Sequence, residues 1–332
     1  MYQIPWIEKY RPTKLENMIL DEHIYAKIKK IIEEKNMPNI LIPGVPGIGK
    51  TTTVKCIARE FYGKYIDEGM LDLNASDDRG KKSVQDIGDF CKTHMDLNGR
   101  DPNDTRKYAE HKLIFLDEAD NMTTKAQRLI NNMMEKYQKN ARFVLTCNSS
   151  SDIIEGIQSR CIILRYNRLT NEQIISRLQR ICQLENISQY IITTDTLLHI
   201  ANIADGDLRM AINNLQLVYR SFGNGKDPVE ETDVYTICSK PQPFILKQVL
   251  CDCMNNNIIN AKNKIIELKR SGFSVSDMIL GLISCLKNDN DINMDIKIKY
   301  LNIICRYAYI ISNGLSTDLQ LIACLCSLTK VL

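Results

Sequence analysis

The sequence predicts an α/β nucleotide-binding domain followed by an all-helical region, and three observations carry this prediction. A glycine-rich loop at residues 44–49 separates an apolar run from a helical pattern and ends in Lys50 and Thr51. Strand-like apolar runs alternate with helical patterns up to about residue 165, which is the order of a doubly wound parallel sheet. From about Tyr166 onward, apolar residues recur only at helical spacing.

Length and composition indicate a globular protein with more than one domain. A chain of 332 residues exceeds what one hydrophobic core usually organises, and 44% hydrophobic with 25% charged residues is ordinary. The formal net charge of +3 is too small to indicate nucleic-acid binding by itself. Because no signal region and no membrane-length apolar run is present, we expect a soluble intracellular protein.

The twelve cysteines form no recognisable disulfide or metal pattern. They are spread from Cys56 to Cys326 without a C-x-x-C pair, and the four histidines lie far apart. We therefore expect buried, reduced thiols.

The first residues form an irregular segment before a helix predicted at residues 21–35. Trp6, Tyr10 and Arg11 lie in this segment, upstream of the glycine-rich loop. Aromatic residues at this place suit an adenine ring, but they equally suit a packed N-terminal arm. The residues alone leave both interpretations open.

Residues 44–51 follow the spacing G-x-x-x-x-G-K-[ST] of a phosphate-binding loop. Glycines let backbone N–H groups close around phosphates, and the N-terminus of the following helix favours anions. Lys50 is expected to reach the β- and γ-phosphates, and Thr51 to offer its hydroxyl to Mg²⁺. The loop predicts a nucleoside triphosphate site but does not tell what the energy is used for.

A second strand at residues 70–74 leads into a turn and a helix start that carry Arg79, Lys81 and Lys82. Cations together with free N–H groups at a helix N-terminus suit a phosphate backbone. On its own, such a cluster is more commonly a solvated polar turn.

Polar side chains follow two further predicted strands. The strand at residues 111–116 ends at Asp117 and Glu118, and the strand at residues 142–147 ends at Asn148. Open α/β sheets bind ligands at the carboxyl ends of their strands. We therefore expect Asp117 to hold Mg²⁺ and Glu118 to polarise the attacking water, with Asn148 orienting that water or contacting the γ-phosphate.

The remaining patterns give a fifth strand at residues 162–165, a helix before it at residues 123–138, and three helices at residues 170–184, 194–204 and 207–219. Beyond Pro241 lie four or five amphipathic helices without a catalytic constellation. Their apolar faces suit either a monomer core or a subunit interface, which periodicity does not separate.

The ordered motifs GVPGIGKTT, LNASDDRG, IFLDEADNMT, TCNSSSDIIEGIQSRC and GDLRMAINNLQ resemble those of replication factor C small subunits, which belong to the eukaryotic-type AAA+ sliding-clamp loader. The resemblance begins at Pro5, continues through at least Gln216, and extends more weakly beyond Lys240. It implies an AAA+ P-loop NTPase domain with a parallel sheet between helices, then a small helical lid and an all-helical collar, at residues 1–165, 166–238 and 239–332.

The resemblance also implies roles for individual residues. Glu118 would be the catalytic base, Asn148 the sensor-1 residue, and Arg160 an arginine finger acting in trans on ATP bound by the neighbouring subunit. Arg209 matches the sensor-2 arginine that closes the lid. Thr51 and Asp117 would hold Mg²⁺. The residues implied to bind ATP are Tyr10, Arg11, Gly44, Val45, Pro46, Gly47, Ile48, Gly49, Lys50, Thr51, Thr52, Asp117, Asn148 and Arg209.

The family further implies ATP and Mg²⁺ as cofactors. The implied partners are the other loader subunits, large and small, a PCNA-type sliding clamp and primer–template DNA, with no membrane. DNA would be contacted through its backbone by Arg79, Lys81 and Lys82. A nuclear location is expected, or a cytoplasmic replication site if the chain is viral.

Three departures from the family pattern concern contacts with DNA or other subunits. Asn131 and Asn132 stand where paired arginines are common, Lys81 and Lys82 replace an apolar–acidic pair, and Gln85 replaces an arginine. Two other functions are weighed: a branch-migration motor, which would carry a winged-helix domain after the lid, and an interaction subunit that binds ATP only to stay folded.

Overall fold

The computed structural model describes residues 4–75, 81–93, 95, 107–222, 228–238, 241–289 and 292–330, with the backbone alone at residues 81–85 and 288. The chain divides into two compact units. The first comprises residues 1–186 and 204–216, and the second residues 187–203 and 217–332.

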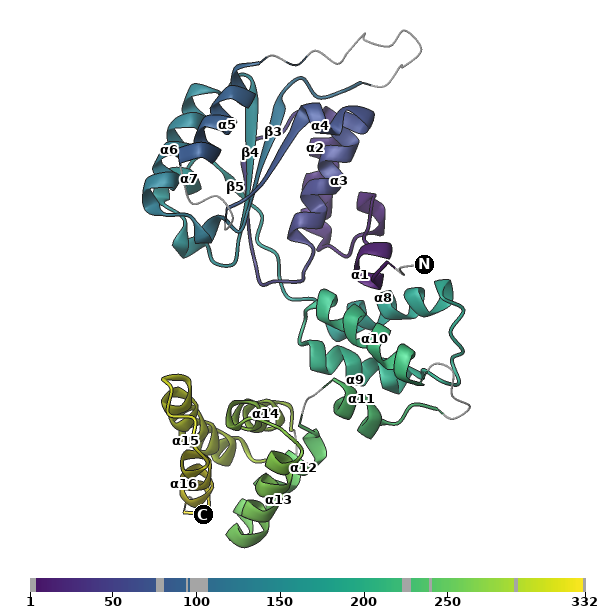
Figure 1. Cartoon of the computed structure of the whole chain (residues 1–332), viewed down its shortest axis with the longest axis vertical. Helices are drawn as coiled ribbons and strands as arrows, with labels where there is room; N and C mark the ends of the chain where they lie inside the picture. Colours follow the sequence, from purple (N-terminus) through teal and green to yellow (C-terminus); the bar gives the residue numbers. More distant parts are fainter. Residues whose placement is uncertain are drawn as a thin grey trace. The chain divides into compact units, whose positions relative to one another are not determined.

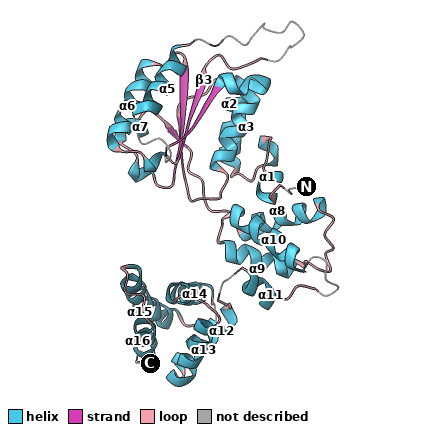
Figure 2. Ribbon diagram, in the orientation of Figure 1, coloured by secondary structure: helices cyan, strands magenta, loops and turns pink. Residues whose placement is uncertain are grey.

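A five-stranded sheet in the order β2-β3-β4-β1-β5 forms the centre of the first unit, and all neighbouring strands are parallel (Figure 2). Each strand lies where the sequence predicts one, although β5 is shorter than expected. The strands are β1 (Ile40–Pro43), β2 (Met70–Asn74), β3 (Lys112–Asp117), β4 (Ala141–Cys147) and β5 (Ile162–Ile163).

Helices cover both faces of this sheet (Figure 1). One face carries α2 (Glu22–Glu34), α3 (Lys50–Tyr62) and α4 (Ile66–Gly69), and the other carries α5 (Lys81–Lys92), α6 (Thr124–Lys136) and α7 (Glu155–Gln158). Alternate strand residues enter two separate cores, because successive side chains of a strand point to opposite faces. In β1, Ile40 and Ile42 join one core and Leu41 the other, and all three are fully buried.

The segment predicted to be irregular at the N-terminus contains a short helix, α1 (Trp6–Lys9), with buried Trp6. Single-turn 3-10 helices occur at Leu15–Asn17, Gly63–Tyr65, Ala119–Asn121 and Ser150–Asp152. The helices after the sheet are α8 (Asn171–Leu184), α9 (Thr194–Ala204), α10 (Leu208–Phe222) and α11 (Glu231–Ile237). A capping box of Thr170 and Gln173 fixes the start of α8.

The C-terminal part of the second unit is all-helical, as predicted. Its helices enclose a core of their own, which includes the fully buried Leu250, Leu282 and Leu325. The helix α14 includes Lys287 and Asn288, which begin the polar stretch at residues 287–291. The helices are α12 (Pro243–Met254), α13 (Ile258–Arg270), α14 (Val275–Asn288), α15 (Met294–Ser312) and α16 (Asp318–Leu328).

All twelve cysteines lie in the described part of the chain and are free. Over the same part, no group of three or more His, Cys, Asp or Glu residues is placed to hold a metal ion. None of the helices described is both long and apolar enough to cross a membrane.

Candidate nucleotide-binding site

The loop between β1 and α3 has a backbone that requires glycine. Gly47 and Gly49 have φ angles of 76° and 96°, which place them in the left-handed region. A Cβ on Gly44 would lie 2.9 Å from the carbonyl oxygen of Tyr166. The loop is therefore narrow and shaped by its backbone, as a phosphate cradle must be.

Lys50 joins the loop to the end of β4. Its Nζ donates hydrogen bonds to the carbonyl oxygens of Gly44 and Val45, the latter at 3.2 Å, and to Oδ1 of Asn148 at 3.3 Å. Burial lowers the pKa of the Lys50 ammonium below its ordinary value, while Asp117 among other groups opposes that shift. Two of the predicted residues thus lie together beside the loop.

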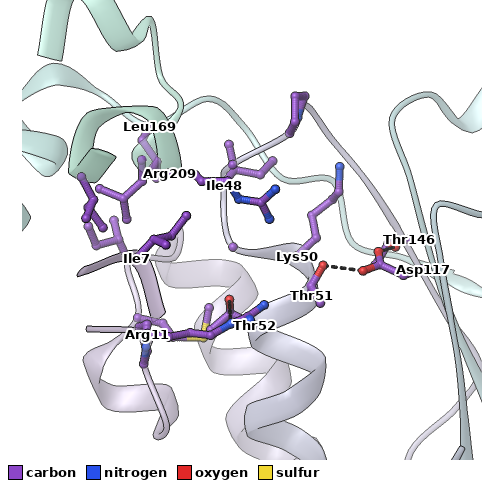
Figure 3. A pocket seen from close by; sticks show the side chains of 18 of the residues that line it. Ile7, Arg11, Ile48, Lys50, Thr51, Thr52, Asp117, Thr146, Leu169 and Arg209 are labelled. Carbon is purple, nitrogen blue, oxygen red and sulfur yellow. Dashed lines mark hydrogen bonds between the residues drawn. The ribbon is translucent and has the colours of Figure 1, made fainter. Parts of the chain in front are cut away.

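Thr51 and Asp117 also meet, and Figure 3 shows them facing each other. The hydroxyl of Thr51 donates to Oδ2 of Asp117 at 2.8 Å. Oδ1 of the same carboxylate accepts a hydrogen bond from the hydroxyl of Thr146. Thr146 is fully buried in β4 and was not predicted, although a threonine next to the end of an apolar strand is a signal that could have indicated it.

Glu118 follows β3 in a left-handed conformation with a φ of 54°, which is uncommon for a residue with a side chain. Its carboxylate is exposed and accepts a hydrogen bond from Nδ2 of Asn121 at 3.2 Å. Asp120 holds Asn148 in place. The backbone N and the side-chain Nδ2 of Asn148 donate hydrogen bonds to Oδ2 of Asp120, at 3.3 Å and 2.8 Å. Asp120 was not predicted, but it belongs to the same acidic motif as Glu118.

The start of α10 lies against the phosphate loop. A Cβ on Gly47 would lie 1.8 Å from Oδ1 of Asp207, so only glycine permits this approach. The same Oδ1 accepts a hydrogen bond from the backbone N of Met210 at 3.0 Å and thereby caps α10. Arg209, two residues after Asp207, lines the pocket with Lys50 (Figure 3).

The N-terminal segment lines the pocket and is also packed against other residues of the first unit, so the packed arm is present and adenine binding by this segment stays a prediction. Nε of Arg11 donates to the hydroxyl of Thr52 at 3.3 Å. The hydroxyl of Tyr10 donates a hydrogen bond to Glu185 at 2.6 Å. The backbone carbonyl oxygen of Tyr10 accepts one from Nη2 of Arg177 at 2.7 Å. Arg177 lines the pocket too, but a single arginine on an amphipathic helix gives no sequence signal.

Arg160 does not line this pocket. It is exposed and donates to Glu135 through Nη2 and to the carbonyl oxygen of Gly156 through Nη1, the latter at 2.9 Å. Of the predicted DNA contacts, Arg79 lies outside the described residues. Lys81 and Lys82 are the first residues of α5, where the structure describes the backbone alone.

These features define an ATPase of the AAA+ class: a phosphate loop on a five-stranded parallel sheet, acids after β3, and an arginine from a following helix at the same pocket. The family described as "ATPase family associated with various cellular activities (AAA)" matches residues 40–169. The fold is similar to that of the RuvB Holliday junction branch migration motor of Thermotoga maritima, with a TM-score of 0.54 and 19% identity over 82% of this chain and 85% of that one.

The chain belongs to the replication factor C small-subunit family. The replication factor C C-terminal domain matches residues 241–327. Replication factor C subunit 4 of Schizosaccharomyces pombe is 39% identical over 99% of this chain and 92% of its own length. A putative replication factor C small subunit of Acanthamoeba polyphaga mimivirus is 36% identical over 98% of this chain and 97% of its own length. The all-helical region therefore occupies the place where a branch-migration motor was expected to carry a winged helix.

Proposed function

We propose that this chain is an ATPase subunit of a heteropentameric clamp loader, which opens a ring-shaped sliding clamp and loads it onto primer–template DNA. The observation that carries the proposal is the separation of two groups of residues. Lys50, Asp117, Glu118 and Arg209 line one pocket, whereas Arg160 is exposed outside it. A nucleotide pocket together with an arginine that lies outside it suits an enzyme that works between neighbouring subunits.

The pocket is assigned to ATP. The phosphate loop and Lys50 would bind the triphosphate, and Arg209 would add a positive charge from α10. Tyr10, Arg11 and Thr52 lie on the side assigned to the adenine and ribose. Asn148 would contact the γ-phosphate, and Glu118 would accept a proton from the attacking water.

Mg²⁺ fits the pair formed by Thr51 and Asp117. Their oxygens are 2.8 Å apart and are the hard donors that Mg²⁺ prefers. When bound, the ion would neutralise phosphate charge. Thr146 would keep the Asp117 carboxylate oriented through its hydrogen bond to Oδ1.

Arg160 is assigned to the ATP of the neighbouring subunit. A cation supplied in trans stabilises the charge on the transferring phosphoryl group, so hydrolysis would depend on assembly. The partners would be the other loader subunits, a PCNA-type clamp and primer–template DNA. Backbone contacts to the DNA are assigned to Arg79, Lys81 and Lys82. The location would be the nucleus, or a cytoplasmic site of replication if the chain is viral.

The test is the ATPase rate of the reconstituted loader, measured with and without clamp and primed DNA. Glu118→Gln should remove this subunit's share of the stimulated rate, because a positioned general base contributes about 10²- to 10⁴-fold. An unchanged stimulated rate would instead favour a subunit that binds ATP only to stay folded. A rate that responds to DNA but not to the clamp would favour another AAA+ motor.

A further inference from the structure

We propose that Glu135 is a positioning residue for Arg160, which holds the guanidinium in the orientation needed to reach the neighbouring subunit's nucleotide. This inference rests on the proposed function, because it takes Arg160 to act in trans. It adds a residue of α6 to that function.

The Arg160 guanidinium is anchored at two of its three nitrogens. Nη1 donates to the carbonyl oxygen of Gly156 at 2.9 Å, and Nη2 donates to Oε1 of Glu135. The relative solvent-accessible area of the Arg160 side chain is nevertheless 36%. A guanidinium has five N–H donors in a rigid planar fork, so these two bonds fix its plane and leave donors for another anionic ligand.

Glu135 belongs to a row of residues on α6 that lies along residues 152–160, the segment that carries Arg160. Gln127, Asn131 and Glu135 are four residues apart and therefore share one face of the helix. Figure 1 shows α6 beside α7.

The first member of the row holds the backbone of residues 152–154 by hydrogen bonds, and the second packs against Gly156. Buried Gln127 donates to the carbonyl oxygen of Asp152 at 3.0 Å and accepts from the backbone N of Ile154 at 2.9 Å. The Oδ1 of Asn131 lies 3.3 Å from where a Cβ of Gly156 would be. Because these contacts fix α6 relative to α7, Glu135 meets Arg160 from a fixed position.

The geometry favours positioning over inhibition. Exposed ion pairs are weak and are screened by salt, so Glu135 cannot keep Arg160 from a triphosphate, which carries more negative charge than one carboxylate. A weak pair can still restrict the rotamers of a long side chain and so reduce the entropy lost when that side chain binds its target.

The test is a double-mutant cycle in the reconstituted loader with clamp and primed DNA. The share of the ATPase rate that depends on Arg160 is the difference between wild type and Arg160→Ala. Glu135→Gln keeps the shape of the side chain and should lower that share about threefold, the size expected for an exposed ion pair. The KM for ATP should not change, and Glu135→Gln should have no effect in the Arg160→Ala background.

Glu155→Gln is the matched control. Glu155 is an exposed carboxylate at the first residue of α7 and makes no ion pair with Arg160, so its neutralisation should leave the rate unchanged. The midpoint of thermal unfolding of each variant chain checks that the fold is kept.

Three results would overturn the inference. They are equal losses for Glu135→Gln and Glu155→Gln, a loss that persists in the Arg160→Ala background, and no loss for Glu135→Gln where Arg160→Ala has a strong effect. The last result would leave the proposed function intact. If Arg160→Ala itself has no effect, both the trans role of Arg160 and the positioning role of Glu135 are wrong.

Discussion

The left-handed backbone of Glu118 places a strained residue at the position assigned to the catalytic base. A residue with a Cβ in this conformation costs about 1 kcal/mol or more, which glycine avoids. Strain of this kind often accompanies function.

Glu118→Gly should therefore raise the free energy of unfolding by about 1 kcal/mol while abolishing hydrolysis. Urea denaturation of the isolated chain measures the first effect, and the stimulated ATPase rate of the loader measures the second. Glu118→Gln is the control, since it should abolish hydrolysis without a gain in stability. Equal stability of the glycine variant and wild type would show that the backbone at this residue is not strained.

His111 is a second residue whose environment has a measurable consequence. It is buried, its Nε2 has no hydrogen-bond partner among the described residues, and its ring packs edge-on against Phe61. Burial, aided by the charge of Arg142, lowers the pKa of His111 from 6.5 to about 4.

The unfolded chain therefore binds a proton at His111 between pH 6.5 and pH 4 while the folded chain does not. Stability should fall as the pH decreases through this window, by on the order of 3 kcal/mol at most. Urea denaturation of wild type and His111→Phe across this range should show the smaller loss in the variant, which cannot titrate there. Parallel curves for the two proteins would contradict the role of His111.

The site residues that were predicted from the sequence are those set by local spacing. Lys50 and Thr51 follow from the loop pattern, and Asp117 follows from a strand end. Thr146 and Arg177 were missed because their roles depend on which strands and helices become neighbours, and that is not encoded in short-range periodicity.

At the scale of elements, β1, β3 and β4 were predicted well because buried parallel strands are largely continuous apolar runs bounded by polar residues. β5 is shorter than predicted: among the described residues it is an edge strand that pairs with β1, and two of its residues form the ladder. The helix α1 was not predicted because a single turn has no helical periodicity; Trp6 is fixed instead by a bond from its backbone N to Gln216, 3.0 Å away.

The N-terminus of α5 carries the prediction about DNA. Replacing Lys81 and Lys82 by Gln should lower the DNA-stimulated ATPase rate, while the basal rate persists. At subsaturating DNA the loss should be largest at low salt and shrink as salt rises, because salt screens the lysine contacts that only the wild type makes; it should be the same for different DNA sequences, because backbone contacts carry no sequence information. Lys92→Gln, at the other end of α5, is the control and should have little effect. Unchanged stimulation at moderate salt would refute the DNA role of both lysines.

At the scale of the whole molecule, the chain combines a nucleotide pocket with an arginine that the pocket does not use. The proposed function gives this arrangement a meaning: each subunit would bind ATP with its own loop and complete the site of its neighbour. The division into three domains at residues 165 and 238 remains a prediction. The two compact units divide the chain in another way, since the predicted lid contributes residues 187–203 to one unit and residues 204–216 to the other.

The most direct test of this account compares ATP binding with ATP hydrolysis in the Arg160→Ala chain. We predict that the variant chain binds ATP with wild-type affinity, because Arg160 lies outside its own pocket. In the loader with clamp and primed DNA, the site facing the variant should hydrolyse ATP about 10³-fold more slowly or worse. Full stimulation by the variant loader, or loss of ATP binding by the variant chain itself, would contradict the account.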